Sequence, residues 1–335
     1  MQSIDSRVIV LGTGGTIAGT SADAGDNVGY SAAQLGVASL VRAVPPLAGM
    51  PIDCEQVAQL DSKDMSHAVW RHLALRCAHH LARPEVCGIV VTHGTDTLEE
   101  TAWFLQRVLA PAKPVVLTAA MRPATALQTD GPQNLLDAVR VVRSPLARGV
   151  VAVLGGWVHG ARDVRKRHPY RIDAFDSGDA GAIGRIEEGE LNLFRPWPAG
   201  DAWGLEMLPT DDASSWPQVE IVTSHAGASG AVVRALCGIG ARGLVVATTG
   251  NGTLHHDLEA ALREAQTQGV AVLRSTRCRD GRVLAAPGDT LPSAGDLTPE
   301  KARVELMLSL MRRKLAVRPR QPAGGPAIRP SGAAP

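Results

Sequence analysis

The sequence predicts an α/β protein of two domains, the larger one N-terminal and built on a doubly wound sheet. The chain has 335 residues, about twice the length of a typical domain. Short apolar runs alternate with helical patterns, as in βαβ units with a parallel sheet covered on both faces. The alternation breaks between residues 194 and 217 and then resumes, which predicts a second, smaller α/β domain.

The N-terminal domain is expected to cover residues 1–193. Its buried strands are predicted from continuous apolar runs at 8–11, 88–92, 114–118 and 149–154. Helices are predicted at 67–81, 96–109 and 132–142. Apolar residues from Leu98 onward repeat at helical spacing, and the Asp96 carboxylate stands where an N-cap belongs.

The C-terminal domain is expected to cover residues 218–317, after a Pro- and Trp-rich linker at 194–217. Its strands are predicted at 219–223, 243–248 and 270–274, and its helices at 229–239, 255–268 and 298–315. Thr298 is the expected N-cap of the last helix, with Pro299 at its first helical position. Residues 318–335 are rich in Pro, Ala, Gly and Arg, which predicts a disordered tail.

The composition argues against several functional classes. Lys and Arg number 34 against 33 Asp and Glu, so no net charge favours nucleic acid or an anionic membrane as partner. Aromatic residues are only 3%, too few for a platform that stacks bases. The five cysteines form no Cys-x-x-Cys pair, and we expect neither a disulfide framework nor a metal site. We predict no membrane span, no signal peptide and a cytoplasmic location.

A glycine-rich turn follows the first predicted strand, at residues 12–19. A dinucleotide fingerprint needs a third glycine where this chain has Ile17, which disfavours a dehydrogenase, and the turn has no P-loop lysine. What remains is a turn that presents the hydroxyls of Thr13 and Thr16. Taken alone, it is more typical of a strand-end turn whose threonines bond to the backbone.

A second polar turn follows the strand at 88–92 and carries Thr95 and Asp96. Ligands of doubly wound sheets bind beyond the carboxyl ends of the strands, so we expect the two turns to share one cleft. His93 is expected to be structural. The basic run 160–167 is typical of a solvated surface, although a desolvated lysine beside a threonine can act as a general base. The run alone does not select which cation would do so.

Two smaller polar stretches complete the candidates. Residues 61–65, with Ser62 and Lys63, are polar enough to bind a zwitterion or, alternatively, to begin the helix at 67. Residues 250–253, which end at Thr253, follow a predicted strand of the second domain and are typical of an Asn-Gly turn.

Five ordered motifs together resemble the bacterial-type L-asparaginase family, which includes the glutaminase-asparaginases. The matching segments are Thr-Gly-Gly-Thr-Ile-Ala at 13–18, His-Gly-Thr-Asp-Thr at 93–97, Ala-Ala-Met-Arg-Pro at 119–123, Asp-Gly-Pro-Gln-Asn-Leu at 130–135 and Arg-Asp-Val at 162–164 before Lys166. The resemblance runs from about residue 8 to 315 and implies a Rossmann-like C-terminal domain. It also implies a homotetramer of intimate dimers, in which the partner's C-terminal domain completes each active site.

The resemblance implies a role for each site residue. Thr16 matches the nucleophile, and Tyr30 matches the tyrosine of a mobile lid at 21–29. Thr95, Asp96 and Lys166 match the second catalytic cluster. The implied substrate-binding groups are Ser62, Lys63, Asp96, the backbone of Ala120, and Thr253. The implied reaction is the hydrolysis of L-asparagine, and also of L-glutamine in some members, through an acyl-enzyme and without a cofactor.

The chain departs from the family pattern at three places. Lys63 stands where well-known members have Gln or Glu, and Thr253 where many have Asn or Ser. Periplasmic members supply a partner-subunit Glu to the substrate amine, whereas residues 274–282 contain no Glu and offer only Asp280. Spacing alone leaves both Thr16 and Thr95 eligible as the nucleophile.

Two rival functions remain open at this point. A glutamine-hydrolysing subunit of a tRNA amidotransferase would be expected to carry an extra N-terminal domain and to bind a partner protein. A non-enzymatic amino-acid sensor would be expected to lose Thr16, Thr95 or Lys166, and all three are present. The sequence therefore favours an amidohydrolase acting on a small-molecule amide.

Overall fold

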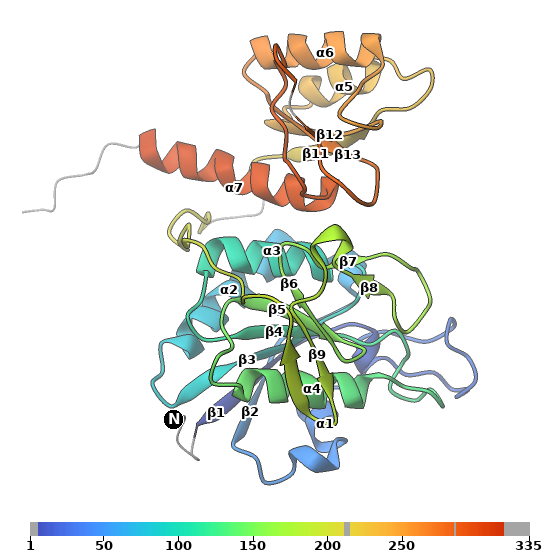
Figure 1. Cartoon of the computed structure of the whole chain (residues 1–335), viewed down its shortest axis with the longest axis vertical. Helices are drawn as coiled ribbons and strands as arrows, with labels where there is room; N and C mark the ends of the chain where they lie inside the picture. Colours follow the sequence, from blue (N-terminus) through green and yellow to red (C-terminus); the bar gives the residue numbers. More distant parts are fainter. Residues whose placement is uncertain (1–5, 211–214, 285, 318–335) are drawn as a thin grey trace, which may run out of the picture.

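The computed structural model describes residues 6–210, 215–284 and 286–317. Figure 1 shows a larger unit built around one sheet and a smaller unit built around another, with the last helix between them. The tail predicted at 318–335 lies outside the described residues. No described helix combines the length and the apolar character that a membrane crossing requires.

Within the described residues, the larger unit holds a mixed eight-stranded sheet in the order β10-β9-β6-β5-β4-β3-β1-β2. Its parallel strands are β1 (Arg7–Gly14), β2 (Ile52–Leu60), β3 (Val86–Thr92), β4 (Val115–Thr118) and β5 (Val150–Leu154). Its antiparallel extension consists of β6 (Trp157–Gly160), β9 (Gly184–Glu187) and β10 (Glu190–Leu193). The sequence did not predict this extension, because its strands are short and, in β10, largely exposed.

Alternate residues of the first strand belong to different cores. Val8 and Val10 pack in the cluster that includes residues of α1 (Val37–Arg42) and α4 (Gly131–Arg143). Ile9 and Leu11 pack in the cluster with residues of α2 (His67–Leu81) and α3 (Leu98–Leu109). A strand with both faces buried reads as a continuous apolar run, which is why the sequence predicted it directly.

The smaller unit is a three-stranded parallel sheet of β11 (Val219–Thr223), β12 (Gly243–Thr248) and β13 (Ala271–Thr276). Helices α5 (Ala231–Gly238) and α6 (His256–Thr267) cover its outer face. Helix α7 (Pro299–Val317) lies between this sheet and α3 of the larger unit (Figure 1). One hydrophobic cluster runs from the large sheet through α3 and α7 to β11 and β12, so the two units share a core.

The segment predicted as a linker takes part in that shared core. Met207, Leu208 and Trp216 are buried in it, and the Trp216 ring stacks on His67 with centroids 4.6 Å apart. This Pro-rich segment therefore connects the two units and also packs its apolar side chains into their shared core. At the last helix, the Thr298 hydroxyl accepts from the Lys301 amide at 3.4 Å, which agrees with the predicted N-cap.

One predicted cap is wrong. The N-cap residue of α3 is Thr97, not Asp96, and its hydroxyl donates to the Ser62 carbonyl at 2.8 Å instead of capping the helix. The Asp96 carboxylate is paired with Lys166. A cationic partner from a distant segment outcompetes the local backbone amides for this carboxylate.

Candidate active site

The two polar turns lie side by side at the carboxyl ends of β1 and β3. The two strands pair in parallel, with Gly12 opposite Thr92, although β2 lies between them in sequence. The parallel order 2-1-3-4-5 therefore reverses at this point, which is where ligands bind in open α/β sheets. A Cβ at Gly15, where φ is +81°, would lie 2.3 Å from Gly94 Cα, so only glycine permits this approach.

Thr16 begins a short 3-10 turn, Thr16–Ala18, directly after β1, and its side chain is buried. Its Oγ1 lies 2.7 Å from the Tyr30 hydroxyl, and either group can be the donor. The chain between them folds back on itself, because Thr20 and Ser31 form an antiparallel bridge. The loop that was expected to act as a lid thus folds back on itself, and its tyrosine is in direct contact with the threonine hydroxyl.

A second loop holds that lid segment. The Ser21 amide donates to Thr125 Oγ1 at 2.8 Å, and the Ala124 amide donates to the Gly19 carbonyl at 2.9 Å. The Leu127 amide donates to the Ala24 carbonyl at 3.2 Å. The sequence analysis did not single out residues 124–127, and their only signal was that they follow the motif at 119–123.

The second cluster joins residues from opposite ends of the larger unit. Lys166 lies on β7 (Arg165–Lys166), which pairs with β8 (Phe175–Asp176). Its Nζ donates to Thr95 Oγ1 at 2.8 Å and to Asp96 Oδ1 at 2.6 Å. Thr95 is buried, whereas Asp96 is half-exposed. The structure thus selects Lys166 from the basic run and brings together the predicted Thr, Asp and Lys.

Ser62 holds the turn that follows β3 through a hydrogen bond to its backbone. Its buried Oγ accepts from the Asp96 amide at 3.1 Å, and a Cβ at Gly94 would lie 2.4 Å from this oxygen. Lys63 points elsewhere: its Nζ pairs with Asp61 at 3.0 Å and with Asp64 at 3.1 Å, and its side chain is 62% exposed. Lys63 lies next to the site in sequence, with its charge already balanced by two carboxylates.

Ala120 and Thr253 lie in different units. Ala120 follows β4 and is fully buried, in the cluster that also holds Ile17. Thr253 is an exposed residue of the smaller unit, where its Oγ1 lies 2.8 Å from that of Thr249. Within the described ranges, no hydrogen bond joins Thr253 to Thr16 or to Thr95. The structure therefore brings Thr16 together with Tyr30, and Thr95 together with Lys166. Among the described residues, Lys63 and Thr253 have no hydrogen bond to either pair.

A cleft of about 670 Å³ runs between the hairpin β7–β8 and the carboxyl ends of β11, β12 and β13. Lys166 lines it, together with Glu99 and Asp280. Asp280, the expected substitute for the partner's Glu, forms a short ion pair with Arg165 of its own chain. Charged groups of both signs thus line the passage between the two units.

His93 is fully buried at the base of the β3 turn. One ring nitrogen lies 2.7 Å from the Gly94 carbonyl and the other 3.0 Å from Thr101 Oγ1. Burial lowers the pKa of its imidazole to about 4, so the ring is neutral at neutral pH. Both nitrogens are engaged in holding the turn to α3, which agrees with a structural role.

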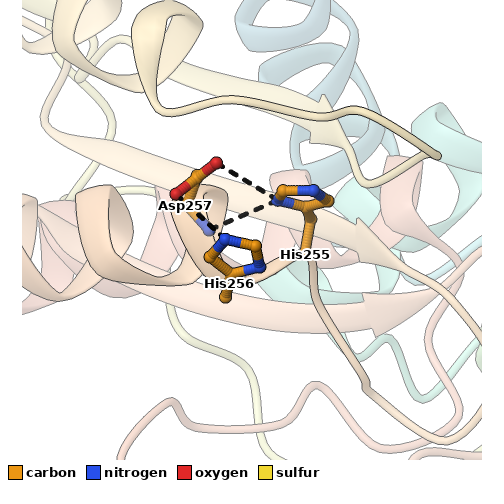
Figure 2. Close-up of side chains that lie close together, drawn as sticks. All are labelled: His255, His256 and Asp257. Carbon is orange, nitrogen blue, oxygen red and sulfur yellow. Dashed lines mark hydrogen bonds and ion pairs between the residues drawn. The ribbon is translucent and has the colours of Figure 1, made fainter.

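Among the described residues, one group could be considered for a metal ion: His255, His256 and Asp257 at the start of α6 (Figure 2). The His255 Nδ1 already accepts from the Asp257 amide at 3.3 Å as the helix cap. The two rings stack with centroids 4.5 Å apart and planes 23° apart. The Asp257 carboxylate lies 3.8 Å from His255 Nδ1 and 3.3 Å from His256 Nε2, so the three groups contact one another at the surface.

Comparisons with known proteins match both units. Residues 7–199 match the family "Asparaginase, N-terminal", and residues 218–317 match "Glutaminase/Asparaginase C-terminal domain". The glutaminase-asparaginase of Pseudomonas fluorescens is 37% identical, over 91% of this chain and 86% of that protein. L-asparaginase 2 of Escherichia coli is 36% identical, over 92% of this chain and 90% of that protein.

A solved structure agrees with these matches. The probable cytoplasmic L-asparaginase from Campylobacter jejuni superposes with a TM-score of 0.84 at 38% identity. The match covers 92% of this chain and 98% of that one. Three findings agree with the family that the sequence motifs indicated. They are the family matches over both units, the relatives above 35% identity and the structural match over 92% of the chain. The chain therefore belongs to the asparaginase family.

Proposed function

We propose that this protein is an amidohydrolase that converts L-asparagine to L-aspartate and ammonia. The observation that carries the proposal is the pair of buried threonine hydroxyls at the ends of adjacent strands, one bonded to Tyr30 and the other to Lys166. The family membership and the relatives named L-asparaginase give the substrate class. L-glutamine is the second candidate substrate, because a relative of equal identity is named a glutaminase-asparaginase.

In this proposal Thr16 Oγ1 attacks the amide carbon of the substrate. The Thr16 proton passes to the Thr95–Lys166 pair, in which Lys166 is the proposed base and Asp96 orients it. Backbone amides near Thr95 and Ala120 stabilise the oxyanion, an effect of about 3–4 kcal/mol per donor in other hydrolases. The C–N bond then breaks, the leaving amine takes a proton and departs as ammonia, and water hydrolyses the Thr16 ester.

The substrate's charged ends are placed around the same turn. Ser62 and Asp96 hold the α-carboxylate and α-amino groups, and Lys63 lies at the rim. Asp96 is suited to the α-ammonium because its carboxylate is half-exposed and only one of its oxygens is bonded to Lys166. Tyr30 closes the site and holds the Thr16 hydroxyl in one orientation. A dry, closed site strengthens each of these electrostatic contacts.

The assembly and the location are proposed on less direct support. We propose domains at 1–193 and 218–317 and a homotetramer in which Thr253 of the partner subunit completes the site. Support comes from Thr253, which is exposed and bonds only within its own loop among the described residues. A cytoplasmic location is proposed because the similar Campylobacter jejuni protein is titled a probable cytoplasmic enzyme.

Ammonia release from L-asparagine and L-glutamine, measured side by side, tests the activity. The Thr16→Ala variant serves as the blank, and it is expected to keep the fold and lose turnover because it lacks the proposed nucleophile. Circular dichroism and the thermal midpoint confirm that the variant is folded. Turnover in folded Thr16→Ala at the wild-type rate would remove Thr16 from the role, and no release by the wild type would reject asparagine hydrolysis.

A further inference from the structure

The last helix, α7, holds the backbone that precedes Lys166. Lys301 lies in the first turn of α7 and is fully buried, at 0% exposure. Its Nζ donates to the Arg162 carbonyl at 2.8 Å and, in a shorter contact, to the Val164 carbonyl. These two carbonyls belong to the chain that leads directly into β7 and Lys166. A cation from the smaller unit therefore fixes the backbone that carries the proposed base.

Glu99 holds the same segment from the other side. It lies in the first turn of α3, close in sequence to Asp96, and it lines the same cleft as Lys166, whose backbone amide lowers the pKa of the Glu99 carboxyl. Glu99 Oε2 is buried and has no hydrogen-bond partner among the described groups. Burial raises the pKa of Glu99 to about 7, and the attraction of Lys301 opposes that rise.

Burying an ammonium group is costly unless hydrogen bonds and opposite charges compensate for the lost hydration. Lys301 has both, since it bonds two carbonyls and is attracted by Glu99 and Asp163. Neither carbonyl can shift without leaving the buried ammonium with fewer bonds. The segment 162–166 is thereby held in the position from which Lys166 Nζ reaches Thr95 and Asp96.

We propose that Lys301 and Glu99 are positioning residues for Lys166, which clamp its backbone between α7 and α3. The proposal rests on the function proposed above, because it needs Lys166 to take part in turnover. A displacement of about 1 Å of a reacting group can lower a rate by about 10²-fold. The clamp also ties the position of the base to the packing of the smaller unit, since α7 contacts β11, β12 and β13.

The main variant is Lys301→Met, which keeps an unbranched apolar stem and removes the donors. Its matched control is Arg303→Met on the same helix, because Arg303 also donates to a backbone carbonyl, that of Val219, at 2.8 Å. We expect Lys301→Met to lower kcat on asparagine at least about tenfold with KM within about threefold, and Arg303→Met to leave both within about threefold.

Hydrogen exchange supplies a readout that a general loss of stability would not give. In Lys301→Met, the peptide that covers residues 162–167 is expected to exchange faster than in the wild type, while peptides of β1 and β3 are unchanged. Normal kcat in a folded Lys301→Met variant would overturn the proposal. So would a loss of kcat accompanied by faster exchange throughout the large sheet.

A second pair of variants decides the matter if Lys301→Met fails to fold. Glu99→Gln keeps a polar group beside the Lys166 amide, whereas Glu99→Leu removes it. We expect Gln to retain kcat within about threefold, and Leu to lose at least about tenfold with faster exchange at 162–167. Equal activity of the two variants, or equal exchange at 162–167, would overturn the role of Glu99.

Failure of this proposal is distinguishable from failure of the proposed function. If Lys166→Met is inactive while the Lys301 and Glu99 variants are fully active, the base assignment stands and the clamp falls. If Lys166→Met is active, the base assignment itself falls, whatever the other variants show.

Discussion

At the scale of single residues, the site depends on two hydroxyl contacts that come from different segments. The Tyr30 hydroxyl reaches Thr16 across a folded-back loop, and Lys166 reaches Thr95 from 71 residues away in sequence. Each contact leaves its threonine with one orientation, which a nucleophile needs before substrate arrives. A threonine hydroxyl is a weak nucleophile by itself, so the activation of Thr16 and Thr95 has to come from the side chains that contact them.

Tyr30→Phe tests the first contact. The variant keeps the ring and loses the hydroxyl that bonds to Thr16, so the threonine side chain gains freedom. A hydrogen bond of this kind contributes about 1 kcal/mol, and we expect kcat to fall at least about fivefold. Steady-state kinetics on L-asparagine measure this, with a thermal scan to show that the fold is intact. A kcat equal to that of the wild type would mean that Tyr30 only closes the site.

Lys166→Met tests the second contact. Loss of a general base typically lowers kcat by about 10²-fold or more, and that is the expected result here. Arg167→Met, the next residue, is the control, because among the described residues the Arg167 side chain forms ion pairs with Asp173 and Asp176, at 3.8 and 3.7 Å, and none with Asp96. An unchanged rate in Lys166→Met would leave this lysine as a structural cation.

At the scale of elements, β2 is joined to α2 by a charged cluster outside the site. Glu55 accepts from Arg76 at 2.6 and 3.0 Å and lies 2.7 Å from His80 Nε2. The Arg76 hydrogen bonds are the main cause that lowers the pKa of Glu55 from 4.5 to about 2. A carboxylate shared by a strand and a helix holds two layers of the larger unit together.

The stability of this cluster should depend on pH in a defined direction. The folded-state pKa of Glu55 lies below its unfolded value, so its contribution is complete above about pH 4.5 and is lost as pH falls toward 2. We expect Glu55→Gln to lower the free energy of unfolding by on the order of 2 kcal/mol at pH 7, after allowance for partial exposure, and by much less at pH 3. Urea titrations at the two pH values give the comparison, with Glu85→Gln as the exposed control.

At the scale of the whole molecule, the two units are joined by a shared apolar core, and the site lies at the edge of the larger one. Trp216, Met207 and α7 fill the space between the sheets, so the units are not expected to move independently. Thr253, in the smaller unit, is exposed and its hydroxyl bonds to that of Thr249 in the same loop.

The proposed assembly can be tested by dilution. If the partner subunit completes the site, specific activity per chain should fall as the oligomer dissociates, because each separated chain lacks Thr253 of the partner subunit. Mass photometry and activity measured over the same concentration range give the two curves. A monomer with full activity would contradict the assembly, and a tetramer whose activity does not follow its dissociation would contradict the shared site.

The sequence by itself determined the strands whose burial is continuous and the polar turns that follow them. Residues 243–248 were predicted with the bounds of β12, all of whose residues are buried, because an apolar run between turn residues carries a strong local signal. The two turns that carry Thr16 and Thr95 were predicted to share one cleft, since parallel strands end at the same edge of a sheet, and the structure places these turns side by side.

Only the tertiary structure decided which charges meet. The basic run at 160–167 contains several cations, and the fold pairs Arg162 with Asp296 and Arg165 with Asp176, which leaves Lys166 for Thr95 and Asp96. The same pairing withdraws Asp96 from the cap that local sequence predicted. Helical and strand periodicity report how each residue is buried, whereas ion pairs between distant segments arise only when the chain folds, and local sequence does not encode them.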